Sequence, residues 1–153
     1  MLAIDQQDKQ ILHYLQQDGK MTIAAIAHEL CLSTTAVYER IKKLEKSGII
    51  NKYVALLDQK KVGKNLIVYI SISLKNHARS YLKKFEDSIN GYDEIMECYH
   101  IAGNFDFLLK AQLKDMEAYQ QFILSKLSVD TNIDKVQSSF VLSKNKHTTA
   151  FSL

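Results

Sequence analysis

Residues 32–48 read LSTTAVYERIKKLEKSG, and this run carries more structural information than any other in the chain. Val37 and Ile41 recur at helical spacing within it, so one side of the run is apolar and suited to a core. Ser33 is a favoured residue at a helix N-terminus, and Gly48 is a favoured residue just beyond a C-terminus. We therefore expect a helix that begins after Ser33, ends before Gly48 and buries one face.

The opposite side of this expected helix is polar. At 100° per residue the side chains that point away from Val37 are Thr35, Tyr38, Glu39, Lys42 and Lys43. Hydroxyl, aromatic and basic groups suit contacts with base edges and phosphates of double-stranded DNA. Ser33 and Thr34 extend the predicted DNA-binding set to the start of the helix. Arg40, at the flank of the apolar face, could reach a phosphate or pair with a nearby acid, and an ordinary solvated face is the alternative for the whole set.

Two further helices are expected before this one. The first has Ile11 and Leu12 on its apolar side and ends at the glycine of Asp18-Gly19, and the second begins after Thr22. Only residues 31–33 separate the second helix from the third. Two helices joined this closely and packed on a preceding helix are typical of a helix-turn-helix unit. An αα-hairpin in another kind of small helical domain is the alternative.

The next segments suggest where this domain ends. Residues 49–57 are rich in β-branched and aromatic residues, which favours a strand that forms a wing or a link. Residues 58–64 are polar and basic, so we place the boundary there, with a DNA-binding domain over 1–64 and a second domain over 65–153. The first part carries ten Lys/Arg and seven Asp/Glu, and the second carries ten of each. This distribution is expected if only the first part meets a polyanion, and chance fluctuation is the alternative.

Beyond residue 64 the spacing of the apolar residues changes. Alternation predicts strands at 66–74, 95–101, 107–113 and 136–142, and helical spacing predicts helices at 78–89 and 116–127. The order strand, helix, strand, strand, helix, strand is that of a ferredoxin-like α+β domain, an antiparallel sheet with both helices on one face. The open face is expected to meet a partner, because Ile67 and Tyr69 make it partly apolar.

Few residues form a motif that is typical of a catalytic site, so an enzyme is not expected. No nucleophile motif, phosphate-binding glycine run or zinc quartet occurs, and Cys98 with His100 could supply two metal ligands at most. Neither a metal nor a cofactor is therefore expected. Two widely spaced cysteines and an opening without a basic, apolar leader favour a cytoplasmic protein, and no run is long enough to span a membrane.

The turn at residues 103–106, Gly-Asn-Phe-Asp, is the exception. A glycine lets backbone N–H groups approach a bound group closely, and a neighbouring carboxylate can accept from an ammonium. Both charged ends of an amino acid could therefore be held here, although most turns of this composition are only turns.

With these residues assembled, the chain resembles the Lrp/AsnC, or feast/famine, family of transcriptional regulators, and within it the leucine-responsive branch. The matching runs are residues 4–12, 32–50, 97–98, 103–110 and 115–119. The resemblance implies a sensing domain that dimerises through its sheets, with dimers that commonly assemble into octamers. Cys31 departs from the family pattern, because a glycine is usual at this place in the turn.

The resemblance also implies an amino-acid site between dimers. By position this site carries over to His100, Ile101, Gly103, Asp106, Met116, Ser138, Ser139 and Phe140. Ser138 and Ser139 depart from the larger or different polar residues of many relatives, so the effector amino acid stays open. Activation or repression, the operator, and a local or global role stay open as well.

Two other functions fit parts of the pattern. The helical domain could contact another protein, which would not require the basic excess of residues 1–64. The ferredoxin-like half could be a small metabolic enzyme, but it lacks a base–nucleophile pair or a metal set.

Overall fold

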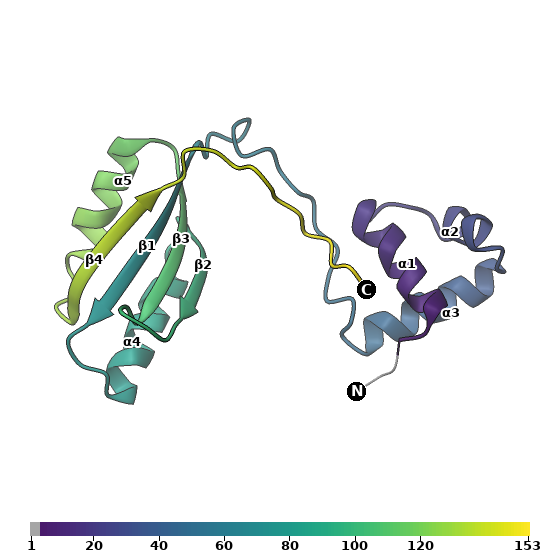
Figure 1. Ribbon diagram of the computed structural model, residues 1–153, viewed down its shortest axis with the longest axis horizontal. Coiled ribbons are helices and arrows are strands. Elements are labelled where there is room, and N and C mark those ends of the chain that lie inside the picture. Colours follow the sequence, from purple (N-terminus) through teal and green to yellow (C-terminus); the bar gives the residue numbers. More distant parts are fainter. Residues whose placement is uncertain (1–3) are drawn as a thin grey trace. The chain divides into compact units, whose positions relative to one another are not determined.

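The structure is a computed structural model that describes residues 4–153 (Figure 1). It divides into two compact units, Met1–Leu56 with Lys146–Leu153 and Leu57–Asn145. The last eight residues, which the sequence assigned to the second domain, thus pack with the first unit.

Three helices form the first unit. They are α1 (Gln6–Gln17), α2 (Ile23–Leu30) and α3 (Thr34–Lys46). The N-termini of α2 and α3 lie where the sequence placed them, because the hydroxyls of Thr22 and Ser33 each accept a hydrogen bond from the backbone N–H three residues later. The helices close on one apolar core made of Ile11, Leu12, Ile26, Ala27, Val37, Ile41 and Leu44. The predicted helix-turn-helix arrangement is confirmed.

The turn between α2 and α3 depends on an unusual backbone conformation at Cys31. Its φ of 53° and ψ of 40° are left-handed, and it is the one non-glycine residue with positive φ within 4–153. The N–H of Cys31 donates to the carbonyl of His28, and the N–H of Leu32 donates to that of Ala27, which closes the helix end. The side chain that replaces the family's usual glycine is therefore accommodated in a conformation that glycine adopts more easily.

Replacing Cys31 by glycine is expected to stabilise the first unit by about 1 kcal/mol, because a Cβ is unfavourable in left-handed backbone. Denaturant unfolding of the full chain measures this difference. Cys31→Ala is the matched control, since it removes the thiol and keeps the Cβ, and it should not stabilise. Equal stabilisation by both variants would mean that the thiol, rather than the backbone, is the source of the strain.

The strand predicted over residues 49–57 is wrong. The chain there forms bends and then irregular structure, with Tyr53, Val54 and Leu56 exposed. Within the described chain, the backbone N–H groups of residues 51–57 donate to no other backbone group. Strand-forming composition does not suffice, because a strand needs a neighbour that pairs with its backbone.

The C-terminal segment contacts α1 of the same unit. The side-chain amide of Gln16 accepts from the N–H of Phe151 at 2.6 Å and donates to its carbonyl at 3.2 Å. One side chain thus satisfies both backbone groups of Phe151, much as a neighbouring strand would.

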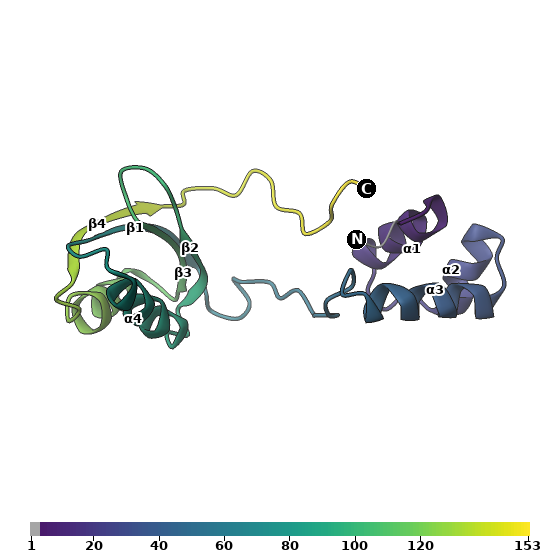
Figure 2. The ribbon, with the colours of Figure 1, turned by 90° about the horizontal axis from the view of Figure 1, so that it is seen from below.

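The second unit is a sheet covered on one face by helices (Figures 1 and 2). Its elements are β1 (Leu66–Leu74), α4 (Arg79–Asn90), β2 (Ile95–His100), β3 (Phe107–Leu113), α5 (Met116–Phe122), the π-helical turn η1 (Ile123–Leu127) and β4 (Ile133–Phe140). The strands lie in the order β2-β3-β1-β4, and each neighbouring pair is antiparallel. The ferredoxin-like α+β fold predicted from the sequence is confirmed.

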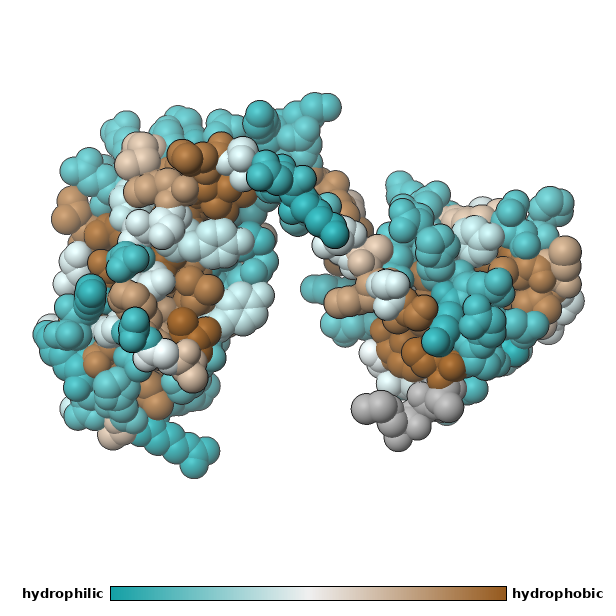
Figure 3. Space-filling view, in the orientation of Figure 1, coloured by the Kyte–Doolittle hydropathy of each residue, from teal (hydrophilic) through white to brown (hydrophobic). Residues whose placement is uncertain are grey.

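The two faces of this sheet differ in composition. Val68, Ile70 and Ile72 of β1 point into the core beneath the helices, while the intervening residues form the open face. Apolar and intermediate side chains are interspersed with polar ones on that open face (Figure 3). The predicted alternation of β2 is interrupted, because the register shifts between Ile95 and Glu97.

Candidate functional site

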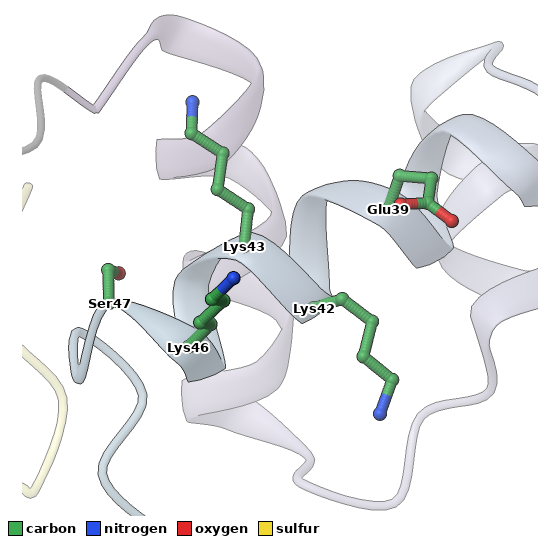
Figure 4. Close-up of a pocket in the computed structure, with 5 residues that line it drawn as sticks. All are labelled: Glu39, Lys42, Lys43, Lys46 and Ser47. Carbon is green, nitrogen blue, oxygen red and sulfur yellow. The ribbon is translucent and has the colours of Figure 1, made fainter.

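The exposed face of α3 presents a basic surface. Tyr38 and Glu39 are exposed, as predicted, together with Thr35, Lys42 and Lys43. A shallow depression on this face is lined by Glu39, Lys42, Lys43, Lys46 and Ser47 (Figure 4). Lys46 and Ser47 were not in the predicted set. Helical spacing could have found Lys46, since it follows Lys42 by four residues.

The cations of this surface differ in how far they are engaged. The Lys42 ammonium lies 3.6 Å from a carboxylate oxygen of Glu45 and 5.6 Å from the centre of the Tyr38 ring. Within residues 4–153, Lys43 has no ion pair. Lys43 is therefore free to meet a phosphate without breaking an internal ion pair.

At the start of α3, the two predicted residues differ in role. The Ser33 hydroxyl accepts a hydrogen bond from the N–H of Ala36 at 3.1 Å, so it caps the helix. Thr34 is exposed as the first residue of the helix. Helix N-termini present free N–H groups that suit phosphate.

Arg40 is held by α1. Its Nη1 lies 2.6 Å from Asp5 Oδ2 and 2.7 Å from Asp8 Oδ1, and the Asp8 side chain is only 1% exposed. The hydrogen bond to Asp5, and then that to Asp8, raise the pKa of the Arg40 guanidinium above its ordinary value. Of the two roles that the sequence left open for Arg40, pairing with an acid is the one this structure contains.

In the second unit, the predicted effector residue His100 is the last residue of β2, and Ile101, Gly103 and Asp106 lie on the turn between β2 and β3. The N–H of Ile101 donates to the carbonyl of Asp106 at 2.8 Å, which closes the turn. Gly103 has a φ of +142°, a conformation that favours glycine. In the described chain the N–H groups of residues 102–105 donate to no protein acceptor. These donors are available to an anionic group.

The carboxylate of Asp106 ties this turn to the end of β1. Its Oδ2 accepts from the N–H of Leu74 at 2.7 Å, and its Oδ1 lies 3.0 Å from Nε2 of His77. Burial by itself raises the pKa of Asp106, but the hydrogen bonds from Leu74 and His77 outweigh it and leave the pKa below its ordinary value. Asp106 is therefore an anion at neutral pH, as the predicted role requires.

Sequence reasoning did not identify His77. It lies 29 residues from Asp106 in the chain, and the pairing of Ile72 with Phe107 brings the two together. The predicted antiparallel order of the strands could have placed the end of β1 near the start of β3, but no local motif marks His77.

Two of the remaining predicted effector residues, Ser138 and Phe140, form a second group with Tyr119. The Tyr119 hydroxyl donates to Ser138 Oγ at 2.8 Å, and the rings of Tyr119 and Phe140 meet edge to face at 5.1 Å between centres. Ser138 pairs with Ile70, four residues before Leu74 on β1, a span of about 13 Å along the strand.

Within one chain, the turn and this second group are therefore separate. Ser138 and Ser139 lie on opposite faces of the sheet, because successive strand residues alternate. Met116, the first residue of α5, is exposed, and the His100 ring stacks on Phe107 at 4.8 Å.

Residues 4–153 contain neither a metal-binding cluster nor a membrane-spanning helix. No group of three or more His, Cys, Asp or Glu side chains is placed to hold a metal ion. No helix in this part of the chain is long and apolar enough to cross a membrane.

Both units of the chain have counterparts among known proteins. Residues 4–45 match the AsnC-type helix-turn-helix domain, and residues 67–151 match the Lrp/AsnC ligand binding domain. The transcriptional regulator AzlB of Bacillus subtilis is 34% identical, over 96% of this chain and 94% of its own. The leucine-responsive regulatory protein of Escherichia coli is 34% identical, over 78% of this chain and 73% of its own.

A solved structure agrees with these matches. The transcriptional regulator NMB0573 of Neisseria meningitidis, in complex with L-Met, is 33% identical and superposes with a TM-score of 0.93. The comparison covers 98% of this chain and 97% of that one. Two matched domains and relatives at this identity across almost the whole chain describe a regulator rather than an enzyme. The chain belongs to the Lrp/AsnC family of transcriptional regulators.

Proposed function

We propose that the protein recognises specific sites on double-stranded DNA through the exposed face of α3. The observation that carries this proposal is the basic surface of Lys42, Lys43 and Lys46, which follows the exposed Thr35 and Tyr38 on the same helix. Lysines along such a helix suit phosphates, and a hydroxyl with an aromatic ring suits base edges. A regulator must reach the DNA, so we place the protein in the cytoplasm.

Changing Lys42 and Lys43 together to alanine is expected to weaken binding to all DNA sequences alike. The slope of log affinity against log salt should shrink by ~0.9 for each phosphate contact that is lost. Titration of the full chain with labelled duplex at several salt concentrations measures both quantities.

The matched control is the double alanine variant at Lys83 and Lys84, two exposed lysines of α4 in the second unit. It removes the same charge and should leave the salt slope unchanged. If both double variants lower the slope equally, the effect is one of net charge, and this face of α3 is not the DNA contact.

For the second unit we propose a free amino acid as effector. Its ammonium would lie at the Asp106 carboxylate, and its carboxylate would lie on the free N–H groups of residues 102–105. Support comes from the charge of Asp106, from these unused donors and from the similarity to a regulator that binds L-Met. Calorimetric titration of the full chain with L-methionine, and then with the other standard L-amino acids, tests for a saturable heat of binding.

We also propose that two copies pair through the open sheet face. Tyr69 and Tyr99 stand exposed on it, and exposed aromatic side chains are enriched at protein interfaces. Further assembly of dimers, up to an octamer, would bring the turn at residues 103–106 of one copy close to Tyr119, Ser138 and Phe140 of another. Sedimentation of the full chain across a concentration series measures the assembly, and a monomer at all concentrations would contradict it.

A further inference from the structure

The two oxygens of the Asp106 carboxylate are engaged in different ways. Oδ2 accepts from a backbone N–H, that of Leu74, whose residue is buried. Oδ1 contacts the imidazole of His77, whose side chain is 59% exposed while that of Asp106 is 21% exposed. One oxygen is therefore fixed by the sheet, and the other by a side chain that reaches into solvent.

This difference decides which oxygen a bound cation can use. Freeing Oδ2 would leave the buried N–H of Leu74 without a partner, and an unpaired buried donor is unfavourable. Freeing Oδ1 only turns an exposed imidazole into water, and an exposed ion pair contributes much less. An ammonium that approaches Asp106 thus exchanges with His77 at Oδ1 and leaves the bond to Leu74 in place.

The neighbours of His77 are anchored independently of its ring. Lys75 donates its N–H to the carbonyl of Asn132 at 2.8 Å, and Asn76 donates its own to the side chain of Asn132 at 3.1 Å. Asn132 returns a bond from its amide to the carbonyl of Asn76 at 3.2 Å. The imidazole can therefore move without displacing the chain before α4.

We propose that His77 competes with the ammonium group of the effector amino acid for Oδ1 of Asp106, and so sets the affinity and pH dependence of effector binding. This inference rests on the proposed function, in which an amino acid binds at this turn. His77 acts here as a residue that tunes specificity and regulation, and it is outside the set that the sequence identified.

The charge state of His77 determines the direction in which effector affinity changes with pH. A protonated imidazole holds Oδ1 more strongly and repels an ammonium, whereas a neutral one yields more easily. Histidine is the side chain whose charge changes most readily near neutral pH. Effector affinity should therefore be lower in mildly acidic than in mildly basic solution.

A substitution of His77 leaves the other charged groups near the turn in place. His100 at the end of β2 adds a further electrostatic contribution at Asp106, and the Lys135 ammonium of β4 lies 5.3 Å from the centre of the Phe105 ring. Their influence on the pH profile is common to the wild type and the variant, so the difference between the two proteins isolates His77.

The test is calorimetry of the full chain with L-methionine, and with the other L-amino acids if L-methionine is silent, at pH 6 and pH 8. His77→Ala should bind about threefold more tightly than the wild type at pH 6 and nearly equally at pH 8, which is the size of effect that an exposed ion pair provides. His28→Ala, which removes an exposed histidine of α2 in the first unit, should match the wild type at both values.

A double-mutant cycle locates the effect. In the background of Asp106→Asn the change at His77 should alter affinity by much less, because the competition needs the charged oxygen. Additive effects would overturn the inference, as would weaker or unchanged binding by His77→Ala at pH 6. Those results leave the effector proposal standing, whereas the absence of binding by every amino acid to both the wild type and His77→Ala refutes the effector proposal and the inference together.

Discussion

Replacing Arg40 by alanine is expected to lower the free energy of unfolding of the first unit by about 3 kcal/mol, because it leaves the Asp8 carboxylate buried without its partner. Asp8 is 1% exposed, and its bond to Arg40 at 2.7 Å joins α1 to α3. Denaturant unfolding of the full chain, followed by circular dichroism, measures the change. At a temperature where the variant is folded, its DNA salt slope should equal that of the wild type, since this guanidinium is committed to α1.

Two controls separate the buried pair from the exposed one. Asp5→Asn should cost at most about 1 kcal/mol, because its pair with Arg40 is exposed and an amide still caps α1. The double change of Asp8 to leucine and Arg40 to methionine should cost less than Arg40→Ala alone, because it leaves no buried charge. A loss below about 1 kcal/mol for Arg40→Ala would mean that water reaches Asp8 and replaces the guanidinium.

Replacing Phe107 by alanine is expected to destabilise the second unit by about 4 kcal/mol, since the change removes a fully buried ring and leaves a cavity. Phe107 is 0% exposed, and its ring lies 4.6 Å from that of Phe85 and 4.8 Å from that of His100, between centres. It also follows Asp106 directly, so the core position and the effector turn are adjacent. Thermal unfolding of the full chain measures the loss.

Phe107→Leu is the matched control, because it keeps an apolar side chain and should cost clearly less. The two units have separate apolar cores. The transition of the first unit should therefore stay in place while that of the second moves to lower temperature. A single transition that shifts as a whole would show that the two units unfold together.

The parts of the fold that follow from short-range chemistry were predictable. The hydroxyls of Thr22 and Ser33 cap helices where the sequence placed them, because a cap needs only residues within one turn. The alternation of apolar residues predicted the observed bounds of β1 and β3, because this pattern also depends only on nearby residues. The exposed face of α3 followed from helical spacing alone.

Features that depend on distant partners were not predictable. Residues 49–57 have strand-forming composition, but no strand within residues 4–153 pairs with them, and the sequence holds no sign of that absence. The pairing of Arg40 with an acid depends on Asp8, which lies 32 residues earlier in the chain. The contact of His77 with Asp106 arises from strand register, which a one-residue shift would abolish.

The contact between Gln16 and Phe151 affects the order in which the two units can form all their contacts during synthesis. Domains generally fold as the chain is made, with the N-terminal one first. Here α1 to α3 are synthesised before the second unit, yet the segment that pairs with Gln16 follows the second unit in the chain. The strands of the second unit are all made in the interval. The first unit can therefore complete its contacts only after the second unit has been synthesised.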